Sequence, residues 1–398
     1  MKTLYRIQQL GMNLVTRIAS QKEPILYEGN DSLYKIVDLL LQTGKTRVFI
    51  ATTSGFIRRR TLSHFFDELN SHGIHTTIYS DILPDPTVEC IEQGVLAYKN
   101  GSCEAIIAIG GGSVIDCAKI IGARLVRPNR TIQDMRGTLK IRKQLPDFYA
   151  VPTTAGTGSE ATAAAVVTDT IDGTHYKYSI NDLCLVPKYA VLDPVLSSTL
   201  PPHITAATGM DALTHAVETY TNRFASSKVQ EHALKAVGLI YENLPLAYQD
   251  GANLEARKNM LLGSYHAGIA FTNNFVGYVH AISHAIGALY GVAHGEANAI
   301  LLPYVLEQYG KSSYKQLAEL AIAAGIQGNS HEALALSFIE SIRTMNRNMN
   351  LPDKVVQLQE KDYETIIQRA LKEANPMYPV PVIWGHDDFE TLLKKVIG

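Results

Sequence analysis

The sequence predicts an α/β protein of two domains, the first built on a doubly wound parallel sheet and the second entirely helical. Three observations support this fold class. The 398 residues exceed what one compact core usually contains. Strand-like and helix-like segments alternate through the first 154 residues. From about Pro201 onward, the apolar residues follow helical periodicity almost without interruption.

The alternating segments define the elements of the first domain. Runs of β-branched and apolar residues predict buried strands over residues 46–53, 75–82, 103–110 and 147–154. Helical spacing of apolar residues predicts helices over residues 31–44, 56–73, 87–101 and 113–126. Strands that alternate with helices in this way form a parallel sheet whose two faces are both covered.

The second domain is predicted from helical patterns alone. These patterns cover residues 204–222, 229–248, 254–271, 296–310, 314–325, 332–349 and 361–374. A segment rich in proline and serine, Asp193–Pro202, precedes them and is typical of a linker. We therefore predict an α/β domain over residues 1–195 and an all-helical domain over residues 196–398.

Composition and charge exclude several classes of partner. The formal net charge is −2 and charged residues make up 19% of the chain, which argues against nucleic acid or an anionic membrane as a partner. The N-terminus has no apolar core typical of a signal peptide, and no run reaches the length of a membrane span. The four cysteines form no CxxC pair, so we expect reduced thiols in a cytoplasmic protein.

A glycine loop joins a predicted strand directly to a predicted helix in "AIIAIGGGSVIDCAK". Gly111 and Gly112 let the backbone approach a ligand closely, and the amides at the start of the helix attract anions. Ser113 can donate to a phosphate oxygen, and Asp116 in the first turn suits the helix dipole. The motif is neither GxGxxG nor a Walker loop. A plain turn needs one glycine, so three in a row favour pyrophosphate binding.

A second polar loop, "PTTAGTGSE" at Pro152–Glu160, follows the next strand. Two such loops at strand carboxyl ends are typical of a nucleotide site in a doubly wound sheet. Thr53 stands near the end of the first predicted strand, where a carboxylate would select NAD by binding the ribose 2′-hydroxyl. The absence of a carboxylate at this position slightly favours NADP. The nearby run Arg58–Arg60 is consistent with a 2′-phosphate but equally with a solvated helix surface.

Histidines and one aspartate recur at helical-turn spacing within apolar segments. They are Asp211, His215, His280, His284 and His294, with His266 as a further candidate. An isolated histidine of this kind is more often a core residue, but burying several polar groups together is costly without a partner. A divalent metal such as Fe²⁺ or Zn²⁺ would provide one. Spacing alone leaves open whether His284 or His294 completes the ligand set with His280.

These motifs identify a family. Over its whole length the chain resembles the iron-containing (group III) alcohol dehydrogenases, through "GGGSVIDCAK", "PTTAGTGSE", "AATGMDALTHAVE" and "VHAISHAIGALYGVAHGEANAILLP". The resemblance implies a nucleotide-binding α/β domain, a helical metal-binding domain and, by likeness, a homodimer. It also implies reversible hydride transfer between a primary or secondary alcohol and NAD(P)⁺ to give an aldehyde or ketone. In this reaction the metal, Fe²⁺ or alternatively Zn²⁺, polarises the alcohol oxygen.

The resemblance also assigns residues to the metal and to the substrate side of the site. The family's metal ligands correspond to Asp211, His215, His280 and His294. His284 corresponds to a histidine that does not bind metal but lies near nicotinamide and substrate, where it could relay a proton as a catalytic residue. Ala164, in "EATAAAVV", and Phe271 are expected to line the substrate pocket.

Residues of the cofactor site follow from the same resemblance. Together with Asp116, they are Thr53, Asp85, Gly111, Gly112, Ser113, Thr153, Thr154, Thr157 and Lys177. The glycine loop would hold the diphosphate, and Lys177 would contact a ribose. Thr153, Thr154 and Thr157 would lie beside the nicotinamide. Thr53 replaces the aspartate of NAD-preferring members, which again favours NADP slightly.

Three other functions remain as alternatives. A glycerol-dehydrogenase-type polyol oxidoreductase would have a three-ligand zinc site, whereas this chain offers four ligands. A dehydroquinate-synthase-like lyase would need a cluster of Lys and Arg, which the segments around the histidines lack. A protein that binds nucleotide or metal without catalysis would show no turnover with an aldehyde.

Overall fold

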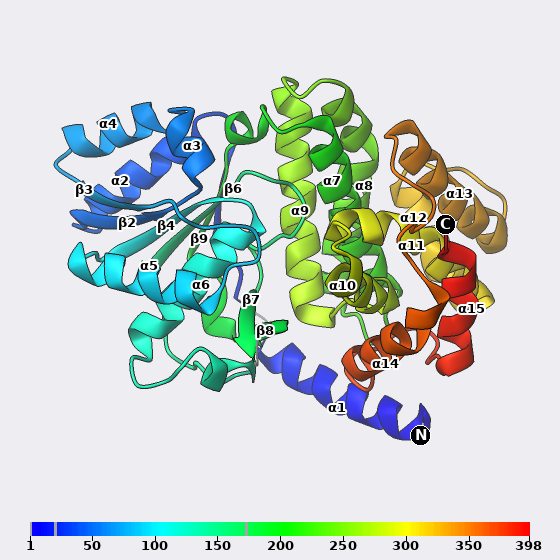
Figure 1. Ribbon diagram of the computed structural model, residues 1–398. Coiled ribbons are helices and arrows are strands. Elements are labelled where there is room, and N and C mark those ends of the chain that lie inside the picture. Colours follow the sequence, from blue (N-terminus) through cyan, green and yellow to red (C-terminus); the bar gives the residue numbers. More distant parts are fainter. Residues whose placement is uncertain (1, 20–21, 172–173) are drawn as a thin grey trace. The chain divides into compact units, whose positions relative to one another are not determined.

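The computed structural model describes residues 2–19, 22–171 and 174–398 (Figure 1). The chain divides into two units, Gln21–Thr199 and Met1–Ser20 with Leu200–Gly398. The predicted division at residue 195 instead placed the N-terminus with the α/β domain. Helix α1 (Lys2–Ala19) is tied to the helical unit because Arg6 and Gln9 donate to the carbonyls of Pro381 and Tyr378, at 3.0 and 2.8 Å. No local pattern predicts contacts so distant in sequence.

A parallel sheet forms the centre of the first unit, as predicted. Its strands lie in the order β1 (Ile25–Glu28), β9 (Tyr189–Leu192), β6 (Asp147–Pro152), β4 (Ala105–Gly110), β2 (Arg47–Ala51) and β3 (His75–Tyr79). Every pair of neighbours is parallel. The four predicted strands correspond to β2, β3, β4 and β6. The edge strand β1 and its neighbour β9 were not predicted because four residues are too few to establish a period.

Helices cover both faces of this sheet (Figure 1). On one side lie α2 (Lys35–Gln42), α3 (Ser54–Arg58) and α4 (Ser63–Ser71), and on the other α5 (Val88–Asn100) and α6 (Gly112–Val126). Successive side chains of β2 point to opposite faces of the sheet. Val48 and Ile50 therefore pack with α2 and α4, whereas Phe49 packs with α5 and α6. This two-sided burial explains why the strands are continuously apolar.

The predicted helix over residues 56–73 is divided into α3 and α4. Arg60, between them, has φ +56°, in the left-handed region, so the chain turns there instead of continuing as one helix.

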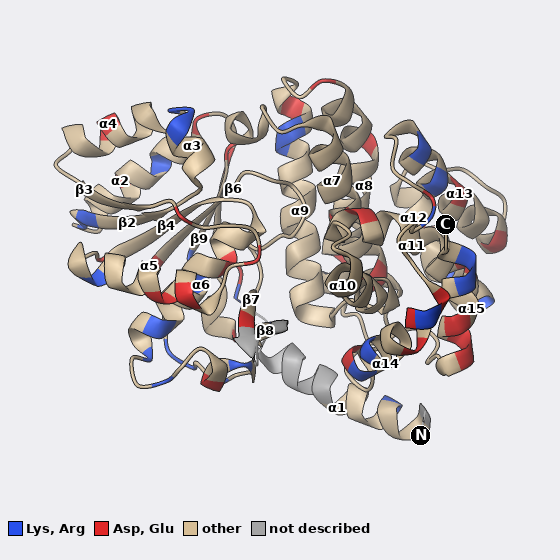
Figure 2. Ribbon diagram, in the orientation of Figure 1, with Lys and Arg blue, Asp and Glu red and all other residues tan. Residues whose placement is uncertain are grey.

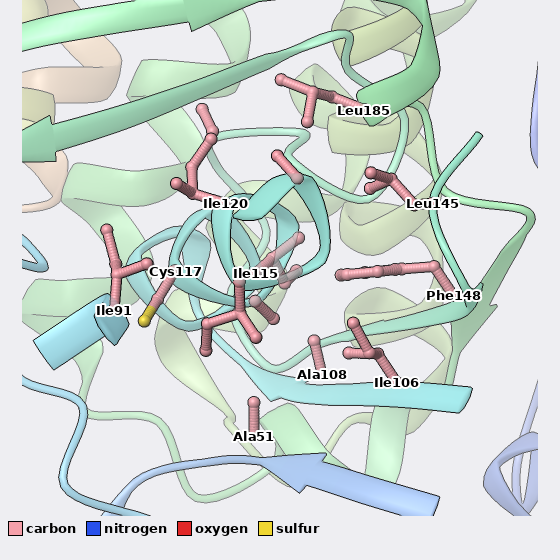
Figure 3. Packing of buried hydrophobic residues seen from close by; sticks show 14 of the residues in the cluster. Ala51, Ile91, Ile106, Ala108, Ile115, Cys117, Ile120, Leu145, Phe148 and Leu185 are labelled. Carbon is pink, nitrogen blue, oxygen red and sulfur yellow. The ribbon is translucent and has the colours of Figure 1, made fainter. Parts of the chain in front are cut away.

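Apolar side chains surround most of helix α6 (Figure 3). Its residues Cys117–Ala123 are buried, and Ile115 and Ile120 contact a cluster that includes Ile106 and Phe148 of the sheet. Because interiors are packed as densely as organic crystals, a helix so enclosed has little freedom to shift. The glycine loop at its N-terminus is therefore fixed by the core.

A smaller sheet follows β6 in the chain. Strands β7 (Ala164–Ile171) and β8 (Thr174–Asn181) pair antiparallel, and β5 (Gly137–Thr138) pairs with β8. This sheet was not predicted. Strand β7 starts where the polar loop after β6 ends, so the smaller sheet anchors that loop.

The second unit is helical in its described residues, and every predicted helical segment is confirmed. Besides α1, its α-helices are α7 (Pro202–Thr221), α8 (Ser227–Gln249), α9 (Leu254–Asn274), α10 (Tyr278–Tyr290), α11 (His294–Tyr309), α12 (Tyr314–Ala323), α13 (His331–Asn348), α14 (Tyr363–Ala374) and α15 (His386–Val396). Helix α7 packs against α8, α9 and α11, so its polar residues are deeply buried.

The charges of the outer helices favour helix formation. Helix α15, which was not predicted, carries Asp387 and Asp388 in its first turn and Lys394 and Lys395 in its last (Figure 2). This arrangement opposes the helix dipole and so stabilises the helix. Within the described ranges, no helix combines the length and apolar character that crossing a bilayer requires.

Two adjacent leucines of α2 test this packing. Leu40 is fully buried between α2 and the sheet, whereas 47% of Leu41 is exposed. Leu40→Ala should lower the free energy of unfolding by about 2–5 kcal/mol, because it removes buried methyl groups and leaves a cavity. Leu41→Ala should change it by less than about 0.5 kcal/mol. Urea unfolding measures both, and equal losses would contradict the described burial.

Candidate metal and nucleotide sites

Four polar side chains predicted as metal ligands lie together in the helical unit. Asp211 and His215 come from α7, His280 from α10 and His294 from the first position of α11. The Asp211 Oδ1 atom lies 3.4 Å from His294 Nε2, 3.6 Å from His280 Nε2 and 3.9 Å from His215 Nδ1. The carboxylate is thus the common neighbour of three imidazoles.

Local sequence explains how two successive helices deliver their histidines to one place. Helix α10 ends at Tyr290, its C-cap Gly291 has a φ of +69°, in the left-handed region, and α11 begins at His294. The reversal brings the rings of His280 and His294 to 5.3 Å between centroids. At Gly295, a Cβ atom would lie 2.1 Å from the carbonyl oxygen of Ala207. Only glycine therefore lets α11 begin this close to α7.

The chemistry of this donor set suits a borderline divalent ion. One ligand atom from each of Asp211, His215 and His280 lies within 4.8 Å of the other two, and all three residues are buried. Burial alone would raise the pKa of Asp211, but the surrounding histidines outweigh it and hold that pKa below its ordinary value. A buried, ionised carboxylate among imidazoles matches the preferences of Fe²⁺ and Zn²⁺.

His284 differs from the four residues above in its surroundings. Its side chain is 46% exposed, and its Nδ1 atom lies 2.8 Å from Glu373 Oε1, to which Tyr378 also donates at 2.9 Å. Its ring stacks on that of His294, with 5.0 Å between centroids. Burial would raise the pKa of Glu373, but the bonds from His284 and Tyr378 outweigh it and lower that pKa. His266, the further candidate, pairs with His232 through Nδ1 atoms 2.9 Å apart.

The glycine loop lies at a topological switch point of the parallel sheet. From β2 the chain proceeds to β3 on one side and then to β4 on the other. Nucleotides bind in doubly wound sheets where strand order reverses in this way. Gly111 is the N-cap of α6, and no N-cap side chain accepts a hydrogen bond from the first amides of the helix. These amides can therefore donate to a bound anion. A Cβ atom on Gly112 would lie 2.7 Å from Thr157 of the second loop.

Several residues predicted to bind cofactor lie beside this loop. The amide of Thr153 donates to the Gly110 carbonyl at 3.0 Å, and a Cβ atom on Gly111 would lie 3.3 Å from Thr154. The Ser113 hydroxyl lies 3.4 Å from the amide of Asp85. Asp85 in turn forms an ion pair with Lys177 at 2.6 Å, and both side chains are about half exposed.

Four further predicted residues have neighbours within their own unit. Asp116 accepts a hydrogen bond from the Val166 amide at 2.9 Å. Thr53, just after β2, forms an isolated bridge with Asp81. Ala164 is the first residue of β7. In the helical unit, Phe271 stacks on His215 with 4.4 Å between ring centroids and an angle of 16°.

Comparison with known proteins decides the family. Residues 24–194 match the model of the iron-containing alcohol dehydrogenases, and residues 205–397 match that of the C-terminal part of the Fe-containing alcohol dehydrogenase family. The chain belongs to the iron-containing alcohol dehydrogenase family. It is therefore an alcohol oxidoreductase that uses NAD(P) and a metal, as the resemblance implied.

Two curated relatives and one solved structure illustrate the likeness. The chain is 33% identical to the NADPH-dependent butanol dehydrogenase of Clostridium saccharobutylicum over 88% of its length and 90% of the relative. It is also 33% identical to the NAD-dependent methanol dehydrogenase of Bacillus methanolicus, over 87% of this chain and 91% of that relative. A crystal structure of 1,3-propanediol oxidoreductase superposes with a TM-score of 0.89 at 30% identity, covering 94% of this chain and 98% of that one.

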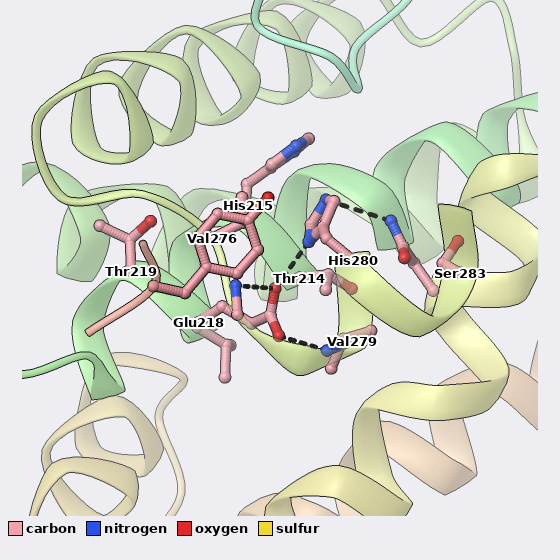
Figure 4. A network of polar contacts seen from close by, with 12 residues as sticks. Thr214, His215, Glu218, Thr219, Val276, Val279, His280 and Ser283 are labelled. Atoms are coloured by element: carbon pink, nitrogen blue, oxygen red, sulfur yellow. Dashed lines mark hydrogen bonds and ion pairs between the residues drawn. The ribbon is translucent and has the colours of Figure 1, made fainter. Parts of the chain in front are cut away.

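Sequence reasoning missed one buried carboxylate of this dehydrogenase. Glu218 on α7 accepts hydrogen bonds from the amides of Gly277 and Val279, at 2.8 and 2.6 Å, and lies 2.6 Å from His280 Nδ1 (Figure 4). This contact assigns the Nδ1 proton of His280 and turns its Nε2 atom toward Asp211. Glu218 follows Asp211 by seven residues, so a search along one face of the helix would have found it.

A buried amide and a hydroxyl were also missed. Asn298, fully buried and one turn after His294, donates from Nδ2 to Asp211 Oδ1 at 2.8 Å. The same Nδ2 atom lies 3.2 Å from the Nε2 atoms of His280 and His294. Ser283 Oγ lies 3.2 Å from His294 Nδ1. These neighbours orient the carboxylate and both imidazoles in the dehydrogenase.

Glu218 provides a test of this orientation. Glu218→Gln keeps the shape of the side chain but loses the charge that holds the His280 proton. It should weaken metal binding to the chelated protein roughly 10- to 100-fold, as loss of such a hydrogen-bond partner usually does. Competition titration with Zn²⁺ measures the change. Glu319→Gln is the matched control, because Glu319 accepts from Tyr220 at 2.6 Å elsewhere in the bundle. Equal weakening in both variants would contradict the role given to Glu218.

Proposed function

We propose that this dehydrogenase reduces small aldehydes with NADPH, and oxidises the corresponding alcohols, at Fe²⁺ held by Asp211, His215, His280 and His294. The observation that carries the proposal is the buried carboxylate with imidazole nitrogens 3.4 to 3.9 Å from one of its oxygens. Such a set is costly to bury without a cation among its members. Bound Fe²⁺ would supply Lewis acidity to the substrate oxygen, and the nicotinamide would accept or donate hydride.

The preference for NADPH is supported by Thr53. This short neutral side chain stands just after β2, where a carboxylate would repel a 2′-phosphate. Relatives of similar identity include an NADPH-dependent butanol dehydrogenase and an NAD-dependent methanol dehydrogenase, so family membership alone does not select the cofactor. The ratio of kcat/KM for NADPH and NADH tests the preference directly.

The chain's own residues have distinct tasks in this proposal. The amides of Gly111 and Gly112 and the hydroxyl of Ser113 bind the diphosphate, and Thr153, Thr154 and Thr157 lie along the nicotinamide side. Phe271 stacks on one face of the buried His215 imidazole.

His284 is the proposed proton carrier. Its ring lies against His294, its side chain is half exposed, and its Nδ1 atom is bound to Glu373, so it links the metal ligands to solvent. We further propose a homodimer, from likeness to the family, which light scattering would test.

Removal of the metal tests the central role given to it. Chelation should abolish aldehyde reduction, because it removes the Lewis acid that polarises the substrate oxygen, and Fe²⁺ should restore it. Nucleotide affinity, measured by nicotinamide fluorescence, should remain unchanged, since none of the residues assigned to the nucleotide is a proposed metal ligand. Full activity in the chelated protein would refute the proposal.

Substitution of His284 separates proton transfer from metal binding. His284→Ala should lower kcat roughly 100-fold or more and remove one limb of the pH–rate profile, because a proton carrier is lost. Metal content should stay at the wild-type level. His386→Ala is a matched control, since His386 on α15 also pairs with a glutamate. Its Nε2 atom lies 2.7 Å from Oε2 of Glu364 on α14. Loss of metal from the His284 variant would mean that the ligands are misassigned.

A further inference from the structure

A buried lysine on α6 has no part in the metal or nucleotide chemistry described above. None of the Lys119 side chain is exposed. Its ammonium donates to the Thr162 carbonyl at 2.7 Å, the Thr162 hydroxyl at 2.9 Å and the Ala164 carbonyl at 2.9 Å. These three acceptors use all three ammonium hydrogens. Burying an ionised amine is costly, so an apolar side chain would serve better here unless these bonds were needed.

Two carboxylates offset the buried charge. Burial lowers the pKa of Lys119 to about 8, while Asp116 and Glu160 act in the opposite direction. Asp116 precedes Lys119 by one helical turn, so both lie on one face of α6. Its carboxylate accepts from the Val166 amide while Lys119 donates to carbonyls on either side of Ala163. Helix α6 thus holds the beginning of β7 through both amides and carbonyls.

These bonds fix one end of the loop that connects β6 to β7. At the other end, the Thr153 amide donates to the carbonyl of Gly110 at 3.0 Å. Between the two anchors, Thr157 occupies the position that a Cβ atom on Gly112 would need. The loop therefore lies directly on the glycine loop. Both of its anchors depend on β4 and α6, which the apolar cluster of Figure 3 encloses.

We propose that Lys119 is a positioning residue for the nucleotide, because it fastens Thr162 and Ala164 to α6 and so holds Thr153–Thr157 against the glycine loop. This inference rests on the proposed function, which assigns both loops to NADPH. Loops already ordered in the binding arrangement lose less conformational freedom when the ligand binds, and affinity rises accordingly. Lys119 thereby acts on the cofactor without touching it.

Three variants test the inference in the full-length, metal-loaded enzyme. Lys119→Met keeps the length of the side chain and removes its three donors. It should raise the Kd for NADPH, measured by nicotinamide fluorescence, at least about tenfold. The KM for NADPH should rise in parallel, while kcat at saturating NADPH and metal content change less than about twofold. Thr162→Val, which removes one acceptor, should raise the Kd about three- to tenfold. Thr162→Ser, which keeps the hydroxyl, should bind like the wild type.

A control variant distinguishes positioning from general stability. Phe65→Leu perturbs the core on the opposite face of the sheet and should lower Tm while leaving the Kd for NADPH unchanged. If Lys119→Met does not fold, the pair of Thr162 variants decides the matter. Wild-type Kd values in folded Lys119→Met and Thr162→Val would overturn the inference, as would an equal rise in Phe65→Leu. Failure of the wild type to bind any nicotinamide nucleotide would instead overturn the proposed function.

Discussion

The burial of one carboxylate governs the arrangement of the helical unit. Asp211 lies in the middle of α7, a helix enclosed by α8, α9 and α11, where an isolated charge would be prohibitively costly. Two other helices contribute a compensating group within reach of its oxygens: His280 comes from α10 and Asn298 from α11. The packing of these helices is thus constrained by electrostatics as well as by apolar contact. Glu218 is a second buried carboxylate on α7, and it too is paired with an imidazole, because it lies against Nδ1 of His280.

The α/β unit depends on a different constraint, which is the rigidity of α6. The helix is enclosed by apolar side chains, begins at the glycine loop and sends two charged side chains to the adjacent strand β7. Core packing, loop anchoring and the proposed anion binding therefore all involve one element. Such a combination limits the substitutions that α6 can accept more strongly than any single role would.

Much of this arrangement was predictable because it is recorded in local patterns. Apolar runs identified β2, β3, β4 and β6, and helical spacing placed Asp211 and His215 on one face of α7. The position of His294 beside Asp211 was not predictable from spacing, since it depends on the left-handed turn at Gly291 and the approach of α11 to α7 at Gly295. Family resemblance, not spacing, favoured His294. Lys119 was overlooked because a lone lysine in an apolar helix carries no periodic signal.

The contact between Gly295 and Ala207 has a consequence for how such a protein can diverge. The two helices meet there through backbone atoms, with no room for a Cβ atom between them. A backbone contact does not depend on the identity of the surrounding side chains, so it sets the distance between α7 and α11 at this point directly. This offers a physical reason why the separation of the two helices at this point can survive changes in the side chains around it.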